Sequence, residues 1–382
     1  MNITLLEPYN TGSHAAWAKE YSRFSRHRVD ILSLPGRHWK WRMHGGAVTL
    51  ARKFLASPFQ PDLLLATDML DLTTFLALTR HKSAQCKCAV YFHENQLTYP
   101  WSPDDADQAM GRDQHYAFIN YATALAADAV LFNSSYHLQS FVAELPRFLA
   151  AFPDKNEAGT VQIIREKSRV LSLGMDLRRF DPYRPAERDR DDKRPPLILW
   201  NHRWEYDKNP LDFFRAMGEL VDKGLDFQLA ILGERFTNSP AVFSEAREKL
   251  GDRIVHYGFV KDFAAYAEWL WRGDILPVTS HHDFFGGSVV QAMHCNCYPL
   301  LPRRLAYPEH IPAEHHCRFI YDDQAELVEK LAGLILNIRA TRSELPRQFV
   351  ARYDWQRLAP FYDDLFEKMV AEGSIGTGGI AG

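Results

Sequence analysis

Two cations stand on a short polar stretch that follows an apolar run. Arg203 and Lys208 come after the predicted strand Leu197–Trp200, and a helical pattern begins behind them. The amides and the dipole at the start of a helix attract anions, and Arg and Lys side chains add positive charge that grips phosphates. This arrangement predicts a diphosphate site. The alternative is that both cations pair at the surface with Glu205 and Asp207.

A glycine pair marks a second stretch of the same kind. Gly286 and Gly287 follow the apolar run Ile275–Thr279, and a helical pattern comes next. Glycine lets backbone amides approach a ligand closely. Asp283 and Gln291 flank this turn and can bind hydroxyl groups of a sugar and of a ribose. A plain turn before a capped helix fits the same residues equally well, because such turns are common.

Polar clusters also follow three apolar runs in the first half of the chain. Gly12 lies after the first run and can bring backbone amides against a phosphate, although a tight turn explains it as well. The cluster His93–Gln96 follows the fourth run. A lone histidine is usually structural, but the carboxyl end of a parallel strand favours function. Asn133–Ser135, after the fifth run, is better explained as a helix cap.

The most basic part of the sequence is the stretch 19–53. Nine Lys and Arg residues against Glu20 and Asp30 give +7, in a chain whose total charge is −3. Its centre alternates cations with Trp39 and Trp41. Phosphates with flat bases match such a surface, and so does an anionic membrane. The alternative is a solvated face with both tryptophans packed in the core.

The elements that must position these residues alternate between strand and helix. Continuous apolar strands separated by helices are typical of parallel sheets covered on both faces. The predicted strands are Ile3–Leu6, Val29–Leu34, Leu63–Ala66, Ala89–Phe92, Ala129–Phe132, Val170–Leu173, Leu197–Trp200, Phe227–Leu232, Ile254–Tyr257, Ile275–Thr279, Tyr298–Leu301 and Phe319–Tyr321. Helices are predicted over 107–127, 134–149, 209–222, 240–250, 262–271, 287–295 and 324–339.

This alternation predicts an α/β fold with two facing, doubly wound, Rossmann-like domains and a cleft between them. Ligands of such sheets bind at the carboxyl ends of the strands. The length of 382 residues suits two domains. We predict an N-terminal domain over 1–180, a charged linker over 181–196, a C-terminal domain over 197–372 and a disordered, glycine-rich tail over 373–382.

Composition narrows the classes of function. A net charge of −3 and a pI of about 6.6 give no global basic field, so nucleic-acid binding must be local. Apolar runs are too short to span a membrane and no targeting segment is evident, so we expect a cytoplasmic protein. The five cysteines lack metal or redox spacing, and packing explains them better than a metal site does.

The sequence resembles family 4 glycosyltransferases of the GT-B fold. Arg203 and Lys208, followed by Asp283–Gly287 and Gln291, carry this resemblance. From Ile3 to about Asp364 it is similar, more specifically, to the tRNA-queuosine alpha-mannosyltransferases. The decapeptide Tyr91–Pro100 is the most specific of the shared stretches, and the others are 12–14, 39–42, 132–134, 202–208, 232–234 and 295–300.

The resemblance implies transfer of mannose from GDP-mannose to the cyclopentene diol of queuosine at the tRNA wobble position, with retention of configuration and no metal or other cofactor. Its implied catalytic residues are His93, Arg203, Lys208 and Asp283. Its implied donor-binding residues are Gly12, Ser13, Arg203, Lys208, Gly233, Phe259, Asp283, Phe285, Gly286, Gly287 and Gln291. Its implied acceptor-binding residues are His14, Trp39, Lys40, Trp41, Arg42, Glu94, Asn95 and Gln96.

The resemblance also assigns roles. Arg203 and Lys208 would hold the diphosphate and stabilise the leaving GDP, which two cations can do without a carboxylate nucleophile. His93 would lie near the transferred sugar, and the turn around Phe259 near the base. Asp283 would contact the sugar and Gln291 the ribose. The expected partners are queuosine-containing tRNA and the nucleotide sugar, and the oligomeric state stays open.

The chain departs from the family pattern at two positions. Asp283 and Gln291 stand where the family has two glutamates. Glutamine lacks the charge of a carboxylate, and aspartate is one methylene shorter. Another hexose, or UDP in place of GDP, is therefore compatible with the sequence. So are two other functions: a peripheral-membrane glycosyltransferase acting on a lipid or polysaccharide, and a catalytically silent protein that binds a sugar nucleotide or RNA.

Overall fold

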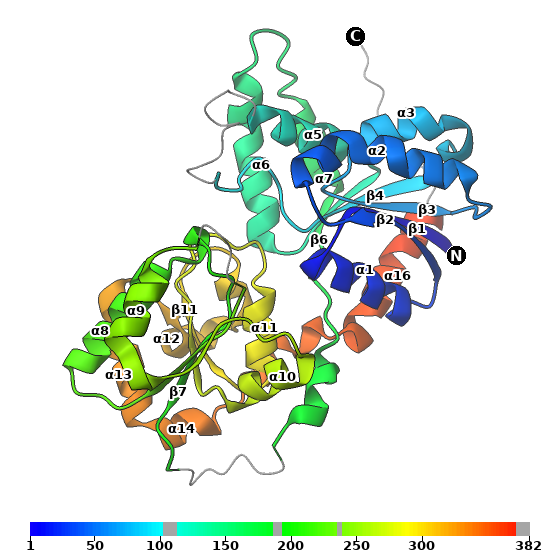
Figure 1. Cartoon of the computed structure of the whole chain (residues 1–382). Helices are drawn as coiled ribbons and strands as arrows, with labels where there is room; N and C mark the ends of the chain where they lie inside the picture. Colours follow the sequence, from blue (N-terminus) through cyan, green and yellow to red (C-terminus); the bar gives the residue numbers. More distant parts are fainter. Residues whose placement is uncertain (102–112, 186–192, 235–238, 372–382) are drawn as a thin grey trace. The chain divides into compact units, whose positions relative to one another are not determined.

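A computed structural model describes residues 1–101, 113–185, 193–234 and 239–371 (Figure 1). The chain forms two compact units. Unit 1 comprises Met1–Asp176 and Trp355–Gly382, and unit 2 comprises Leu177–Asp354. The tail predicted over 373–382 lies outside the described residues.

Unit 1 is built on a six-stranded parallel sheet in the order β2-β1-β3-β4-β5-β6. Its strands are β1 (Asn2–Asn10), β2 (Arg28–Pro35), β3 (Leu63–Thr67), β4 (Lys87–Phe92), β5 (Ala129–Phe132) and β6 (Ser168–Val170). Its helices are α1 (Gly12–Phe24), α2 (Trp39–Ala56), α3 (Leu72–Ser83), α5 (Asp113–Ala126), α6 (Ser135–Ala150), α7 (Thr160–Lys167) and α16 (Trp355–Ala371). Every residue of β3 and β5 is buried, as a parallel sheet with two covered faces requires.

The last helix among the described residues belongs to unit 1, whereas the sequence prediction placed it in the C-terminal domain over 197–372. Helix α16 packs against α1 (Figure 1). The Tyr21 hydroxyl donates to Asp363 Oδ1 at 2.9 Å, and the Trp355 indole donates to Glu20 Oε2 at 3.0 Å. Local patterning cannot show such contacts, because the partners lie more than three hundred residues apart in sequence.

Unit 2 repeats the architecture with a parallel sheet in the order β12-β11-β10-β7-β8-β9. Its strands are β7 (Leu197–Trp200), β8 (Gln228–Ile231), β9 (Ile254–Tyr257), β10 (Ile275–Pro277), β11 (Tyr298–Pro302) and β12 (Ile320–Tyr321). Its α-helices are α8 (Pro210–Asp222), α9 (Val242–Leu250), α10 (Phe263–Arg272), α11 (Gly287–His294), α12 (His316–Phe319), α13 (Gln324–Leu336), α14 (Ile338–Ser343) and α15 (Arg347–Val350).

The described ends of the predicted linker pack within unit 2. Asp181 lies on a 3-10 helix, η1 (Leu177–Tyr183), and accepts hydrogen bonds from Arg347 at 2.8 and 2.9 Å. At the other end, Arg194 donates to the buried Asp274 at 2.7 and 3.0 Å. Asp181 and Arg194 therefore serve ion pairs within unit 2. Residues 186–192 lie outside the described residues.

The predicted α/β class is confirmed, and each of the twelve predicted strands overlaps an observed one. The helix predicted over 107–127 is described from Asp113 to Ala126, and residues 102–112 lie outside the described residues. The sequence patterns predicted no bounds for α1, α2, α3, α7 or α16. Helix α2 contains Gly45 and Gly46, and α16 contains Pro360, which weaken the helical signal.

Candidate functional site

In unit 2, the Lys208 ammonium is buried and held from three sides. Lys208 ends a short 3-10 helix, η2 (Tyr206–Lys208). Its Nζ donates to the His282 carbonyl at 2.9 Å and lies 3.1 Å from Asp207 Oδ2 and 3.3 Å from Asp283 Oδ2. Burial works to lower the pKa of Lys208, but Asp283 and Asp207 raise it above its ordinary value. The side chain is therefore a fixed positive charge.

The carboxylate of Asp283 joins this cation to the glycine turn. Oδ1 accepts the Gly286 amide at 2.8 Å, and Oδ2 also accepts the Tyr307 hydroxyl at 3.2 Å. Burial works to raise the pKa of Asp283, but nearby Lys208 and two histidines hold it at about 2. Both oxygens of Asp283 are thus engaged by groups of the protein itself.

The turn itself requires glycine. Gly286 has a φ of +85°, and a Cβ placed there would lie 2.9 Å from the Tyr307 ring. Phe285 packs on Tyr353 with ring centroids 5.0 Å apart, and its carbonyl accepts from His310 at 2.6 Å. Helix α11 starts at Gly287. The amides of Val289 and Val290 donate to the Gly286 carbonyl at 3.0 and 3.2 Å, so those of Gly287 and Ser288 can face an anion.

Arg203 and Gln291 stand near a hollow of about 200 Å³ in unit 2. The hollow is lined by Asn201, Arg203, Leu232, Gly233, Glu234, Phe259, Val260 and Tyr266. Arg203 is half-exposed and pairs with Glu205 at 3.0 Å, which is the alternative considered from the sequence. The Tyr266 hydroxyl donates to Gln291 Oε1 at 3.0 Å, so Gln291 can offer a ligand its amide hydrogens.

Two further residues give the hollow its shape. Gly233 has a φ of +116°, and a Cβ there would lie 2.0 Å from the His202 carbonyl oxygen. Phe259 is 57 % exposed. Its ring, with Leu232 and Val260, offers an apolar wall beside the Arg203 guanidinium. A planar base and a phosphate are ligands of this character.

In unit 1, two histidine rings meet at the carboxyl ends of β1 and β4. The His14 and His93 ring centroids are 4.1 Å apart, with a tilt of 35°. His14 Nδ1 lies 3.0 Å from Glu7 Oε2 in a buried pair. Burial works to lower the pKa of His14, but Glu7, Asp68 and Glu94 raise it to about 9. His14 is therefore an imidazolium near neutral pH.

His93 is held by its backbone and stays neutral. Its amide donates to Asp68 Oδ1 at 2.8 Å, and its carbonyl accepts from Asn133 at 2.8 Å. Burial, the charge on His14 and the nearby His137 lower the pKa of His93 well below its ordinary value. Its buried Nε2 has no hydrogen-bond partner among the described residues. A neutral imidazole with an uncommitted nitrogen can contact a hydroxyl group of a ligand.

In the part of the chain that the structure describes, this cluster contains three residues whose ligating atoms are close enough to hold a metal ion. Atoms of Glu7, His14 and His93 lie within 4.8 Å of one another. His14 would have to lose its proton before binding a cation, and its pKa of about 9 opposes this. The expectation that no metal is needed remains a prediction.

The remaining residues predicted in unit 1 divide into exposed and structural ones. Gly12 and Ser13 are exposed at the start of α1. Asn95 Oδ1 accepts the amides of Leu97 and Thr98 at 3.0 and 2.9 Å, so this side chain shapes its own loop. Gln96 donates to the half-buried Glu94 at 3.1 Å.

The two tryptophans of helix α2 lie in different environments. Trp39 packs against Tyr116 and Trp101, with centroids 5.0 and 6.3 Å apart, whereas Trp41 is 64 % exposed. Lys40 Nζ lies 5.7 Å from the Trp39 ring centroid, and Arg42 Nε donates to the Pro35 carbonyl at 3.1 Å. The alternative of two core tryptophans holds for Trp39 and is wrong for Trp41.

Some cations of the basic stretch 19–53 form ion pairs, and others do not contribute to those pairs. Arg26 pairs with Asp364 at 2.7 Å and Arg23 with Asp176 at 3.2 Å, so these cations have partners within unit 1. The expected charge of +7 is thus reduced, and the cations of α2 and the loop before it remain. Arg37, Lys40 and Arg42 lie at the carboxyl edge of the sheet, because α2 begins directly after β2, whereas Arg52 and Lys53 lie near the other end of the helix.

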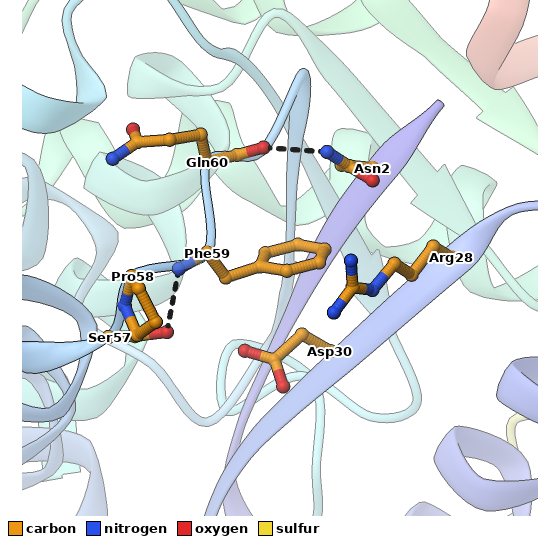
Figure 2. Close-up of a pocket in the computed structure, with 7 residues that line it drawn as sticks. All are labelled: Asn2, Arg28, Asp30, Ser57, Pro58, Phe59 and Gln60. Carbon is orange, nitrogen blue, oxygen red and sulfur yellow. Dashed lines mark hydrogen bonds between the residues drawn. The ribbon is translucent and has the colours of Figure 1, made fainter.

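A shallow polar pocket of about 490 Å³ lies elsewhere in unit 1 (Figure 2). It is lined by Asn2, Arg28, Asp30, Ser57, Pro58, Phe59 and Gln60 (Figure 2). Asn2 and Arg28 begin β1 and β2, so this pocket lies at the amino edge of the sheet, opposite the edge that carries His14 and His93. The candidate site does not include it.

Several residues of the site were not selected as candidates from the sequence. Asp68 directly follows β3, so the rule that selected His93 would also have selected Asp68. Tyr307 lies on a 3-10 helix, η4 (Tyr307–His310), and reaches Asp283 from 24 residues away. Glu7 lies inside β1. No local spacing indicates these last two.

Comparison with known structures shows the fold. The chain superimposes on sucrose-phosphate synthase from Thermosynechococcus elongatus with a TM-score of 0.69 at 15 % identity, covering 98 % of this chain and 100 % of that one. It superimposes on Anabaena HepE in complex with UDP and glucose with a TM-score of 0.64 at 15 % identity, covering 97 % and 100 %. These neighbours are GT-B glycosyltransferases.

Sequence comparison defines the class. Residues 195–337 match the glycosyl transferases group 1 family, and residues 2–175 match the family described as tRNA-queuosine alpha-mannosyltransferase N-terminal. The chain is a glycosyltransferase of the GT-B fold. A tRNA-queuosine alpha-mannosyltransferase from Drosophila melanogaster is 33 % identical to this chain. The aligned region covers 97 % of this chain and 98 % of the Drosophila protein. The chain belongs to the tRNA-queuosine alpha-mannosyltransferase family, which confirms the resemblance seen in the sequence.

A more distant relative covers half of the chain. It is a GDP-mannose-dependent alpha-(1-6)-phosphatidylinositol dimannoside mannosyltransferase from Mycobacterium tuberculosis, 29 % identical over 50 % of this chain and 49 % of its own. Within the described residues, no helix is both long and apolar enough to cross a bilayer.

Proposed function

We propose that this protein transfers mannose from GDP-mannose to the cyclopentene diol of queuosine at the wobble position of tRNA, with retention of configuration. The observation that carries the proposal is the near full-length similarity to the Drosophila protein of that name. The local basic surface of α2 and the cation site of unit 2 support it. A tRNA acceptor also supports the expectation of a cytoplasmic protein.

The proposed reaction breaks the bond between the anomeric carbon of mannose and the β-phosphate oxygen of GDP. The diol oxygen bonds to that carbon from the same face, and its proton passes to the departing phosphate. Negative charge develops on the diphosphate, so positive groups that are already in place lower the barrier. Lys208 is such a group, because its carboxylate partners fix its position before any ligand binds.

The remaining roles follow from what each side chain can still offer. Arg203 can leave Glu205 and grip the phosphates with its planar fork, since an exposed ion pair is weak. The hollow beside Phe259 suits the base. His93 suits a hydroxyl of the transferred sugar. Because Arg203 and Lys208 supply positive charge, the proposal needs no metal, and turnover should persist in excess chelator.

The test is a transfer assay with purified protein, queuosine-containing tRNA and a panel of GDP- and UDP-sugars. Mass spectrometry of the digested nucleosides reads the product. A hexose gained by queuosine only with GDP-mannose is the expected result. A gain with another donor would overturn the choice of donor. Tight binding of a sugar nucleotide without a product on any acceptor would favour the silent binder.

A lipid acceptor is the second candidate, because the mycobacterial relative is named for a phosphatidylinositol mannoside. The discriminating observation is co-sedimentation with anionic vesicles. Retention on vesicles combined with no modification of tRNA would favour the lipid acceptor.

A further inference from the structure

The exposed indole of Trp41 lies against the backbone of its own helix. A Cβ built on Gly45 would lie 2.7 Å from the Trp41 ring. Only glycine leaves this space, and glycine inside a helix lowers its stability. Gly45 therefore leaves room for the ring to pack against the helix backbone, while 64 % of Trp41 stays exposed.

The neighbours of Trp41 anchor the first turn of α2. Trp39 packs in a small cluster with Met43, Met69 and Tyr116. Arg42 Nε is fixed by the Pro35 carbonyl at 3.1 Å. Trp41 is thus an outward-facing ring on an anchored turn, and it loses little conformational freedom when a ligand covers it.

This turn lies beside the histidine cluster of unit 1. It follows β2, whose neighbour in the sheet is β1, and His14 follows β1. Gly36, just before α2, lies so close to Thr11 that a Cβ would be 2.3 Å from the Thr11 side chain. A ligand that contacts Trp41 is therefore at the same sheet edge as His14.

The charges around Trp41 favour RNA over a membrane. Arg37 precedes the helix, and Arg52, eleven residues after Trp41, is exposed on the same side of it about three turns further along. The exposed apolar residues Val48 and Leu55 follow Trp41 at intervals of seven residues, so the three side chains form one narrow row along α2, with Arg52 beside it. They form no broad apolar face of the kind a membrane-bound helix buries. One flat ring among cations matches the base and the phosphates of a single-stranded loop.

We propose that Trp41, packed against Gly45, stacks on an unpaired base of the RNA acceptor while Arg37 and Arg52 face phosphates of the same RNA. The inference rests on the proposed function and adds separate roles for neighbouring residues. Trp41 binds a base, whereas Trp39 and Lys40 pack the helix against the rest of unit 1.

The test measures the dissociation constant of the full chain for queuosine-containing tRNA at several salt concentrations. Trp41→Ala should weaken binding about 10-fold, since base stacking on an aromatic ring contributes on this order. The loss should be equal at every salt concentration, because stacking neutralises no phosphate, and the slope of log affinity against log salt should stay unchanged. Arg52→Ala should make that slope shallower.

Three variants sharpen the result. Trp41→Phe should recover much of the affinity. Gly45→Ala should weaken binding although Trp41 is present, because the new methyl group displaces the ring. The matched control is Phe361→Ala, which removes an aromatic ring 66 % exposed on α16 of the same unit and should bind as wild type does.

Failure of the inference differs from failure of the proposed function. If the wild type binds and modifies tRNA while Trp41→Ala binds equally well, the stacking role is wrong. If the wild type neither binds nor modifies tRNA, the acceptor itself is wrong. If Trp41→Ala reduces binding to anionic vesicles and leaves tRNA affinity unchanged, the partner of this surface is a membrane.

Discussion

Lys208 Nζ lies 3.3 Å from Asp283 Oδ2, and the other oxygen of Asp283 accepts the Gly286 amide. One short carboxylate thereby connects Lys208, the proposed diphosphate ligand, to the glycine turn. Because both oxygens are engaged, Asp283 can reach a sugar hydroxyl only by sharing one of them. The shorter side chain thus binds its own loop, and the backbone of the turn is left to face the ligand.

Removal of either cation should reduce turnover. We expect Arg203→Ala and Lys208→Ala each to lower kcat/KM by about 10²-fold or more, as for loss of a preorganised charge contact. The matched control is Arg215→Ala, a half-exposed cation on α8 that pairs with Asp212. Lys208→Ala leaves two carboxylates without their cation, so its thermal stability must be measured in parallel. Activity near wild type in both variants would refute the diphosphate assignment.

Restoring the family carboxylate should strengthen donor binding. Gln291→Glu keeps an oxygen for the Tyr266 hydroxyl and adds a charge, and charge-assisted hydrogen bonds are about twice as strong as neutral ones. We expect a lower KM for the donor, with kcat nearly unchanged. Gln291→Ala should raise this KM. Steady-state kinetics with the donor varied gives both values, and an unchanged KM in both variants would show that Gln291 does not contact the ribose.

The buried pair of His14 and Glu7 predicts how stability depends on pH. The pKa of His14 rises from 6.5 to about 9 in the folded state, so the proton stabilises the fold fully below pH 6.5. This contribution is lost as the pH rises through 9. The shift corresponds to about 3 kcal/mol.

The measurement compares chemical denaturation of wild type and His14→Gln below pH 6.5 and above pH 9. The difference in unfolding free energy between them should shrink at the higher pH. Burial raises the pKa of Asp68 to about 8 and the charge on His14 lowers it, so the difference between the two proteins reports His14 together with the carboxyl groups that face it. His44→Gln, an exposed histidine of the same unit, serves as the control. A constant difference across this range would contradict the buried imidazolium.

The strands and the edge that carries the site were predictable from sequence, for a local reason. Runs such as Leu63–Ala66 are apolar throughout because both sheet faces are buried, and polar residues that follow a strand reach its carboxyl end. This rule was enough to select His93, Arg203, Lys208 and Asp283.

What the sequence could not supply depends on contacts between distant residues. The assignment of α16 to unit 1 rests on Tyr21 and Asp363, and the confinement of Asp283 rests on Tyr307. Trp39 and Trp41 are two residues apart in one basic stretch, yet one packs and one is exposed. Helix geometry sends them in different directions, and only the neighbours decide which side is the core.

The carbonyl of His202 leaves no room for a side chain at Gly233, which lines the proposed donor hollow. In Gly233→Ala the Cβ would lie 2.0 Å from this backbone oxygen, so either the chain after β7 or that after β8 must move. Both chains line the hollow beside Phe259. The positive φ of +116° adds backbone strain. We expect loss of about 2 kcal/mol or more of stability, as for strain at a special backbone conformation, and weaker donor binding.

The variant Gly224→Ala is the control that distinguishes backbone strain from a steric clash of the new Cβ. Gly224 also has a positive φ, +72°, but a Cβ there meets nothing within 4 Å. Its cost should be limited to about 1 kcal/mol of backbone strain, and donor affinity should be unchanged because Gly224 does not line the hollow. Denaturation and calorimetric titration of GDP-mannose measure the two effects. Equal donor affinity in both variants would show that the His202–Gly233 contact does not shape the nucleotide site.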